Sequence, residues 1–198
     1  DATPLVREVD TYFDENSDMY TNFPRKYKVG ISGCKCCCTP YEIQDVAFRA
    51  FQKDGEVLFD LTVGGGLSKS KQLAYRAKRY VKIDQVKDVA VKCSEIFKDH
   101  GNRQSRNKAR VRHLVNEWGL EKFIDELENR LGYSLMTGTQ EPVVESFENR
   151  NHFGINKAKQ KGFSYIGCAT NSGRVQGNDF IKIYEILKKY DAQGIRLT

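Results

Sequence analysis

The chain contains 198 residues, which is enough for one complete domain and part of a second. Its composition is 39% hydrophobic and 29% charged with a mean hydropathy of -0.60, which excludes a disordered or membrane-embedded protein and indicates a folded, soluble one. The net charge of +6 favours an anionic partner, but it does not choose between nucleic acid, a carboxylate-rich cofactor and a small anion.

The first part of the chain predicts one helix and a small sheet. Apolar residues at helical spacing indicate a helix over residues 4–16. Three β-prone segments follow, with an Asp54-Gly55 turn between the last two, at residues 26–32, 43–51 and 57–63. The triple glycine 64–66 then ends the third strand and allows its backbone to approach a neighbour closely.

Three helices are predicted next. The first begins after Asp84 and ends at His100, the second is a basic helix over residues 105–118, and the third ends at Gly132. The basic helix has Val111, Leu114, Val115 and Trp118 on its apolar side and Arg103, Arg106, Lys108 and Arg110 on the other. A small mixed sheet covered by helices is therefore expected, which places the chain in the α+β class.

Residues 134–151 show no clear period and contain a polar stretch with Pro142, so we expect a linker there. It separates a first domain at 1–133 from a second at 152–198. The second domain should contain a strand at 163–170, a helix at 179–190 and a final strand from Ile195, which together make half of a small α+β domain.

The chain has no run of about 18 apolar residues and no signal peptide at its start, so we expect a cytoplasmic protein without a membrane partner. It does not begin with Met, and its last four residues are a strand-prone run with no turn after it. We therefore expect both ends to have been cut from a longer chain.

The segment 25–28, Arg-Lys-Tyr-Lys, is a candidate small-anion site. On a strand, Lys26 and Lys28 share one face with their stems roughly 7 Å apart. Like charges so close repel unless an anion lies between them, so a buried pair would clamp a small anion. An exposed edge strand protected by lysines fits the same spacing, and the pattern leaves both readings open.

Four cysteines, Cys34, Cys36, Cys37 and Cys38, lie within five residues. A secreted disulfide framework would space them differently, so the crowding suggests metal chemistry or a remnant of it. A tetrahedral metal site normally uses two separated pairs, which favours an oxidisable thiol-rich loop over a metal site built from this run alone.

Three motifs resemble the first half of the nitrite and sulfite reductase haemoprotein family: residues 23–28, residues 63–68, and residues 99–110 with their Asn-Arg pair. They occur in the family's order and spacing, and the similarity covers nearly the whole chain. The resemblance implies the first repeat domain of such an enzyme followed by part of its second ferredoxin-like half-domain.

The resemblance also implies roles for individual residues. Lys26 and Lys28 match the lysines that bind nitrite or sulfite, and Arg25 and Arg110 match residues that contact the carboxylates of sirohaem. The intact enzyme would pass electrons from a ferredoxin or flavoprotein donor through a [4Fe-4S] cluster and sirohaem, reducing nitrite to ammonia or sulfite to sulfide in a six-electron reaction. Both branches of the family share these motifs.

In this family the working cluster cysteines lie in the second repeat, which implies that Cys34 and Cys38 are the vestigial counterpart in the first. The rest of the same polypeptide would then supply the cluster and the remainder of the cofactor pocket. We expect this part alone to be inactive and to bind no stoichiometric cofactor.

Two other classes of function remain open on the residues alone. A nucleic-acid-binding module would use the 103–112 segment as a phosphate-contacting face, although few stacking aromatics support it, which makes nucleic acid an unlikely partner. A thiol-rich metal-binding module would use the cysteine run and carry about one metal ion per chain.

Overall fold

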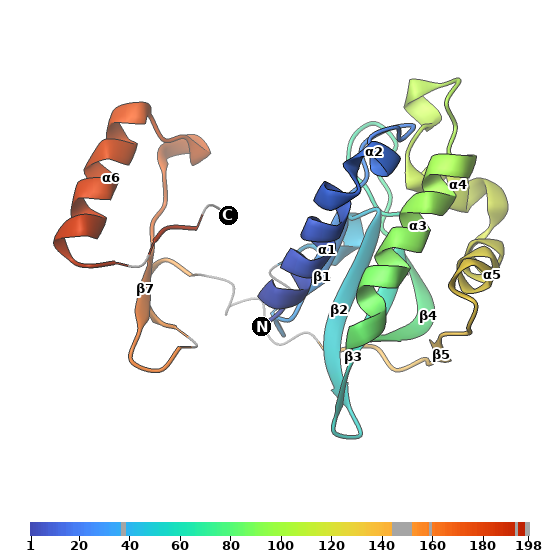
Figure 1. Ribbon diagram of the computed structural model, residues 1–198, viewed down its shortest axis with the longest axis horizontal. Coiled ribbons are helices and arrows are strands. Elements are labelled where there is room, and N and C mark those ends of the chain that lie inside the picture. Colours follow the sequence, from blue (N-terminus) through green and yellow to red (C-terminus); the bar gives the residue numbers. More distant parts are fainter. Residues whose placement is uncertain (37–38, 144–151, 159, 193, 197–198) are drawn as a thin grey trace. The chain divides into compact units, whose positions relative to one another are not determined.

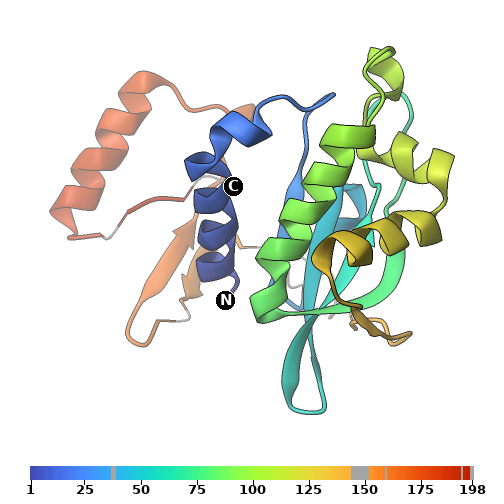
Figure 2. The same ribbon diagram turned by 45° about the vertical axis from the view of Figure 1, so that its right-hand side comes forward.

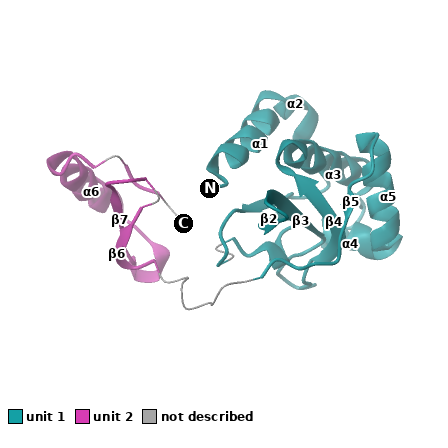
Figure 3. Cartoon of the chain, turned by 90° about the horizontal axis from the view of Figure 1, so that it is seen from below, with its two compact units in different colours: residues 1–147 teal, residues 148–198 magenta. Residues whose placement is uncertain are grey.

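The computed structural model describes residues 1–36, 39–143, 152–158, 160–192 and 194–196. It divides into two compact units, residues 1–147 and 148–198, and each is described by itself (Figure 3). The division falls inside the segment expected to be a linker. The exact domain boundaries expected from the sequence stay a prediction.

Unit 1 is built on a five-stranded mixed sheet (Figure 1), so the expected small mixed sheet is confirmed and has two strands more than the three predicted. Its strands, in both chain and spatial order, are β1 (Val29–Ser32), β2 (Val46–Lys53), β3 (Glu56–Val63), β4 (Tyr75–Lys82) and β5 (Met136–Thr137). β1 runs parallel to β2, and the remaining neighbours are antiparallel. The predicted turn between β2 and β3 is confirmed, with Asp54 and Gly55 both at positive φ.

Helices cover one face of this sheet. They are α1 (Thr3–Glu15), α2 (Ser17–Tyr20), α3 (Val86–His100), α4 (Val111–Trp118) and α5 (Leu120–Leu131). Figure 1 and Figure 2 show α3 lying along the sheet, with α1 on one side and α5 on the other. The apolar side of α3, including Ile96 and Phe97, packs with Phe48 and Leu61 of the sheet in one buried core.

The predicted elements differ from the observed ones in instructive places. β1 begins at Val29 instead of residue 26, and β2 begins at Val46 instead of residue 43. The basic helix expected from residue 105 begins only at Val111, after a single 3-10 turn at Arg106–Lys108. The sequence does not predict β4, because four of its eight residues are Arg or Lys and a positive φ at Lys78 interrupts the alternation.

The sheet face away from α3 is covered by the chain that follows β5. Arg76 binds the Asp60 carboxylate through Nε at 2.8 Å and donates Nη1 to the Thr139 carbonyl at 2.7 Å. The Tyr80 hydroxyl donates to the Gln140 carbonyl at 2.9 Å. The described first part of the expected linker therefore packs on unit 1 through backbone carbonyls.

Unit 2 contains a hairpin of β6 (Gly154–Lys157) and β7 (Ser164–Gly167), and then α6 (Gly177–Lys189). None of its described residues is buried. The expected final strand is not seen at residues 195 and 196, and its last two residues lie outside the described part. A helix and a hairpin with exposed apolar side chains fit the expected half-domain.

In the described part of the chain, no helix has the length and apolar character needed to cross a membrane.

Phe97→Ala is expected to lower the free energy of unfolding by about 3 to 5 kcal/mol, because it removes a fully buried ring that stacks on Phe23 and Tyr27. Leu73→Ala is the matched control, because that side chain is 68% exposed and its loss should cost less than about 0.5 kcal/mol. Urea denaturation of the chain measures both. Equal losses would contradict the packing described here.

Candidate anion-binding site

Four segments of unit 1 meet at one end of the sheet. β1 and β2 are parallel with Val29 beside Val46, so the residues just before them, Lys28 and Asp45, are neighbours. β3 is antiparallel to β2, and its last residue, Val63, pairs with Val46 at the start of β2. The triple glycine 64–66, which follows Val63, therefore lies next to Asp45. Arg110, the residue that precedes α4, reaches this end from across the fold.

A buried ion pair joins these segments. The Asp45 side chain is fully buried and that of Arg110 is 5% exposed. Arg110 donates Nη2 to both carboxylate oxygens at 2.7 and 2.9 Å, and Nε to Oδ1 at 3.1 Å. The backbone N–H of Lys28 donates to Asp45 Oδ2 at 3.0 Å. Burial raises the pKa of Asp45, and the contacts with Arg110 and Lys28 oppose that rise.

The triple glycine packs against the start of β2. Gly64 N–H donates to the Asp45 carbonyl and Gly65 N–H to the Gln44 carbonyl, both at 2.8 Å. A Cβ on Gly65 would collide with the carbonyl oxygens of Glu42 and Gln44. The close backbone approach predicted for these glycines is confirmed, and the partner is the chain entering β2.

Lys28 lies half-buried between cations. Its ammonium group donates to the Ile43 carbonyl at 3.2 Å. Burial lowers its pKa, and the charges of Arg110, Lys26 and Arg112 act in the same direction while Asp45 opposes them. The intervening Tyr27 hydroxyl donates to the Ala90 carbonyl of α3 at 2.9 Å, so Tyr27 is directed into the core.

Arg25 and Lys26 border an open polar cavity of about 470 Å³ that Arg106 also lines. Arg25 donates Nη1 to the Arg106 carbonyl at 2.7 Å, which ties this segment to the turn before α4. Lys26 is exposed to solvent. A concave, positively charged surface therefore lies beside Lys26. Residues 25–28 precede β1 and are not part of the strand, so the predicted strand position of the two lysines is wrong.

Arg112 is a candidate that the sequence pattern does not single out. Its side chain is 4% exposed, and Nε and Nη1 are buried without a hydrogen-bond partner in the described part of the chain. A Cβ at Gly66 would clash with Nη1, so the glycine makes room for the guanidinium. Burial lowers the pKa of Arg112, and Arg110 and Arg25 add to that effect. A buried guanidinium with free donors is costly unless an anion meets it.

The stretch 103–112 does not form the single solvated basic face that a nucleic-acid module would need. Arg103 donates Nη2 to the carbonyls of Asn22 and Lys98 at 2.8 and 2.9 Å, and Arg110 and Arg112 are buried. Because α4 begins at Val111, Arg112 is the one Arg or Lys of this stretch that lies within the helix.

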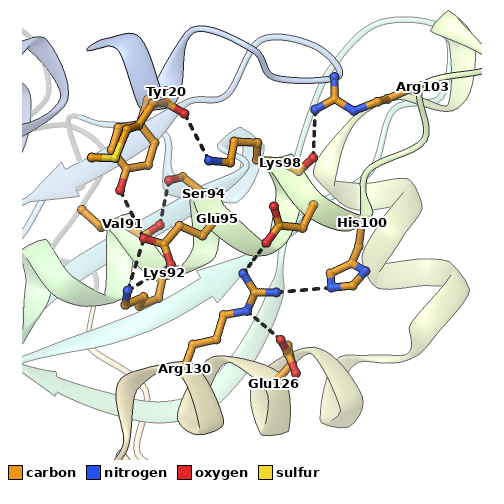
Figure 4. Close-up of polar contacts among 12 residues, drawn as sticks. Tyr20, Val91, Lys92, Ser94, Glu95, Lys98, His100, Arg103, Glu126 and Arg130 are labelled. Atoms are coloured by element: carbon orange, nitrogen blue, oxygen red, sulfur yellow. Dashed lines mark hydrogen bonds and ion pairs between the residues drawn. The ribbon is translucent and has the colours of Figure 1, made fainter. Parts of the chain in front are cut away.

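Two other cations of unit 1, Arg130 and Arg103, have hydrogen-bond partners of their own. Figure 4 shows Arg130 with Nε on Glu126 at 2.6 Å and Nη2 3.3 Å from the His100 ring, and Arg103 beside Lys98. Asp99 accepts the remaining guanidinium nitrogen of Arg130 at 2.7 Å. Arg112, by contrast, is buried with both Nε and Nη1 lacking a hydrogen-bond partner in the described part of the chain.

The cysteine run is only partly described. Cys34 and Cys36 are half-buried, and Cys37 and Cys38 lie outside the described residues. The predicted pair of Cys34 and Cys38 therefore falls partly outside the described residues. Within the described part, no three His, Cys, Asp or Glu side chains gather to hold a metal ion. Cys93 is a core residue, and burial raises the pKa of its thiol.

Residues 1–135 match the family model described as the nitrite and sulphite reductase 4Fe-4S domain. The chain belongs to this family. It is 35% identical over 202 residues to the sulfite reductase [ferredoxin] 1 of Mycolicibacterium paratuberculosis, which covers 100% of this chain and 35% of that protein. It is 32% identical to the chloroplastic ferredoxin–nitrite reductase of Arabidopsis thaliana, over 99% of this chain and 34% of that protein.

A solved structure of the Mycobacterium tuberculosis NirA protein shares the fold, with a TM-score of 0.74 and 35% sequence identity over 84% of this chain and 30% of that one. The α+β fold of a nitrite and sulphite reductase domain is thereby confirmed. The chain spans about a third of the length of the curated relatives it matches.

Arg110→Met is expected to lower the free energy of unfolding at pH 7 by about 3 to 5 kcal/mol, because it leaves the buried Asp45 carboxylate without its ion-pair partner. Without Arg110, the pKa of Asp45 in the folded state rises further above its unfolded value of about 3.9. The folded variant then keeps Asp45 protonated at pH values where the unfolded chain is ionised, so its free energy of unfolding falls as the pH rises above about 4. Denaturation at pH 4 and pH 7 should show the smaller loss at pH 4. Lys53→Met, in an exposed pair with Asp54, is the control and should show no such pH dependence.

Proposed function

We propose that this chain belongs to an enzyme that reduces nitrite or sulfite in a six-electron reaction, and that Lys26 and Lys28 bind the substrate anion. The observation that carries the proposal is an excess of positive charge around one end of the sheet. Lys28, Arg110 and Arg112 lie around the carboxylate of Asp45, and Lys26 and Arg25 add positive charge next to Lys28 and Arg112 in this part of the described chain. Such an excess is stable when anions complete it.

Sirohaem fits this site by the chemistry of its side chains, because it carries many carboxylates that need cationic partners when buried. The unused Nε and Nη1 of Arg112 are suited to that role, and Arg25 is close enough to act electrostatically on Arg112. Arg110 uses Nε and Nη2 on Asp45, which leaves Nη1 for a carboxylate. We therefore assign the macrocycle carboxylates to Arg25, Arg110 and Arg112.

When bound, sirohaem would supply an iron at which the anion reacts and would pass on the electrons that the donor protein delivers. Lys26 and Lys28 would offset the charge on the substrate oxygens and donate hydrogen bonds to them. Burial and the neighbouring cations lower the pKa of Lys28, so its ammonium gives up a proton more readily than an exposed lysine would. The reaction consumes protons, and Lys28 is suited to deliver them.

The iron–sulfur character of the intact enzyme follows from the family, whose matching model is a 4Fe-4S domain. The names of the relatives include ferredoxin, and we infer that a ferredoxin or a flavoprotein also donates electrons here. The rest of the polypeptide would supply the cluster cysteines, with Cys34 and Cys38 as vestigial counterparts. The cytoplasmic location expected from the sequence stays a prediction.

A chimera tests the substrate role. Residues 1–198 replace the aligned segment of the M. paratuberculosis sulfite reductase, and ferredoxin-dependent sulfite and nitrite reduction is measured. Lys26→Met and Lys28→Met should each lower kcat/KM by roughly a hundredfold without changing the sirohaem absorbance, because each removes one charged donor from the anion. Lys53→Met, on the distant β2–β3 hairpin, is the control. Unchanged kcat/KM in both variants would refute the assignment.

Arg112→Met tests the cofactor role by composition. It is expected to lower the sirohaem content of the purified chimera several-fold, because the buried guanidinium then no longer meets a carboxylate. Lys71→Met, at an exposed position in the segment between the triple glycine and β4, should keep the parent's content. If the Arg112→Met variant kept the full sirohaem content and an unchanged absorbance spectrum, the proposed contact between Arg112 and sirohaem would be wrong.

A further inference from the structure

We propose that Asp45 is a positioning residue for the anion site, and that its carboxylate holds Lys28 and Arg110 in place so that Arg112 remains the unpaired guanidinium. The inference rests on the proposed function and deepens it, because it names the residue that arranges the cations. Asp45 does not touch the substrate in this proposal. It acts through the three basic side chains around it.

Asp45 contacts every segment that forms the site. Its carboxylate accepts the Lys28 N–H at 3.0 Å, and the Lys28 carbonyl accepts the Val46 N–H at 3.2 Å, so the lysine segment is attached at two points. The Asp45 carbonyl accepts the Gly64 N–H at 2.8 Å and so fixes the glycine loop that faces Arg112. The bidentate contact with Arg110 fixes the start of α4. One residue therefore sets the relative position of all these parts.

Asp45 also decides which arginine is free. Arg110 and Arg112 lie two residues apart at the start of α4, and both are buried. Arg110 is held on Asp45 by Nε and Nη2, whereas Nε and Nη1 of Arg112 have no partner in the described chain. If the Asp45 charge were absent, the two guanidinium groups would repel each other without an intervening anion. The charged pair thus orients one arginine and leaves the other for an incoming ligand.

The same charge acts on Lys28. The groups that face the Lys28 ammonium are Lys26 on its own segment, Asp45 before β2, and Arg110 and Arg112 at the start of α4. Asp45 is the acid among them, and it raises the pKa of Lys28 against the three cations. Removing its charge should lower the pKa of Lys28 further. An uncharged group of the same shape at this position would not raise the pKa of Lys28 in this way.

The experiment is an NMR titration of the 198-residue chain with ¹³C-labelled lysine, in which Lys28→Met identifies the Lys28 resonance. Asp45→Asn keeps the shape and an acceptor oxygen, and is expected to lower the Lys28 titration midpoint by about one pH unit, a tenfold change in proton affinity. Asp45→Glu restores the charge and should recover most of the shift. Asp54→Asn is the matched control, because that carboxylate is exposed at the hairpin turn.

A folding failure of Asp45→Asn does not end the test. The double variant Asp45→Asn with Arg110→Gln removes both buried charges, and its Lys28 midpoint should still fall, by less than in the single variant, because Asp45 acts on Lys28 more strongly than Arg110 does. A Lys28 midpoint equal to the parent's in the variants that lack the Asp45 charge overturns the positioning role.

Titration with sodium nitrite separates this inference from the proposed function. If nitrite shifts the Lys26 and Lys28 resonances of the parent while Asp45→Asn leaves the Lys28 midpoint unchanged, the anion site stands and the role of Asp45 is overturned. If Asp45→Asn lowers the midpoint and nitrite shifts both lysines, the inference is supported. If nitrite shifts neither lysine at low ionic strength, substrate binding by this pair fails whatever Asp45 does.

Discussion

The buried ion pair between Asp45 and Arg110 is the interaction on which the charged end of unit 1 depends. Moving two charges from water into the protein interior costs free energy. Three hydrogen bonds from Arg110 and one from the Lys28 N–H to the carboxylate offset that cost. The pair connects segments 65 residues apart in the chain. It thereby fixes where β1, β2 and α4 begin relative to one another.

Around this pair the fold assembles more positive charge than it neutralises internally. Arg130 and Arg103, elsewhere in unit 1, have carboxylate or carbonyl partners for their donors. Arg112 is buried with two nitrogens unused, in a space that Gly66 leaves open. A protein interior tolerates such a group when a ligand completes it. The cation excess therefore supports the proposal that an anion rich in oxygen binds here.

The two units differ in how complete they are. Unit 1 has a continuous core in which Phe48, Leu61 and Phe97 are fully buried, and the chain after β5 covers the second face of its sheet. Unit 2 exposes apolar residues such as Ile155, which is 81% exposed, and buries none of its described side chains. A helix and hairpin with that distribution need an apolar partner surface, which fits a chain that spans about a third of its relatives' length.

The sequence by itself determined the family, the α+β class, most helices and the Asp54-Gly55 hairpin, because these depend on local periodicity, turn chemistry and motifs. It did not indicate β4, whose charged residues obscure the alternation, or the late start of α4. The family resemblance singled out Arg110, but nothing in the sequence indicated Asp45 or Arg112. Only the tertiary structure decided that Arg110 is paired with Asp45 while two nitrogens of Arg112 have no partner in the described chain. The physical reason is that their burial and the Asp45 contact depend on segments far apart in the sequence that pack together in the fold, which a local sequence pattern does not indicate.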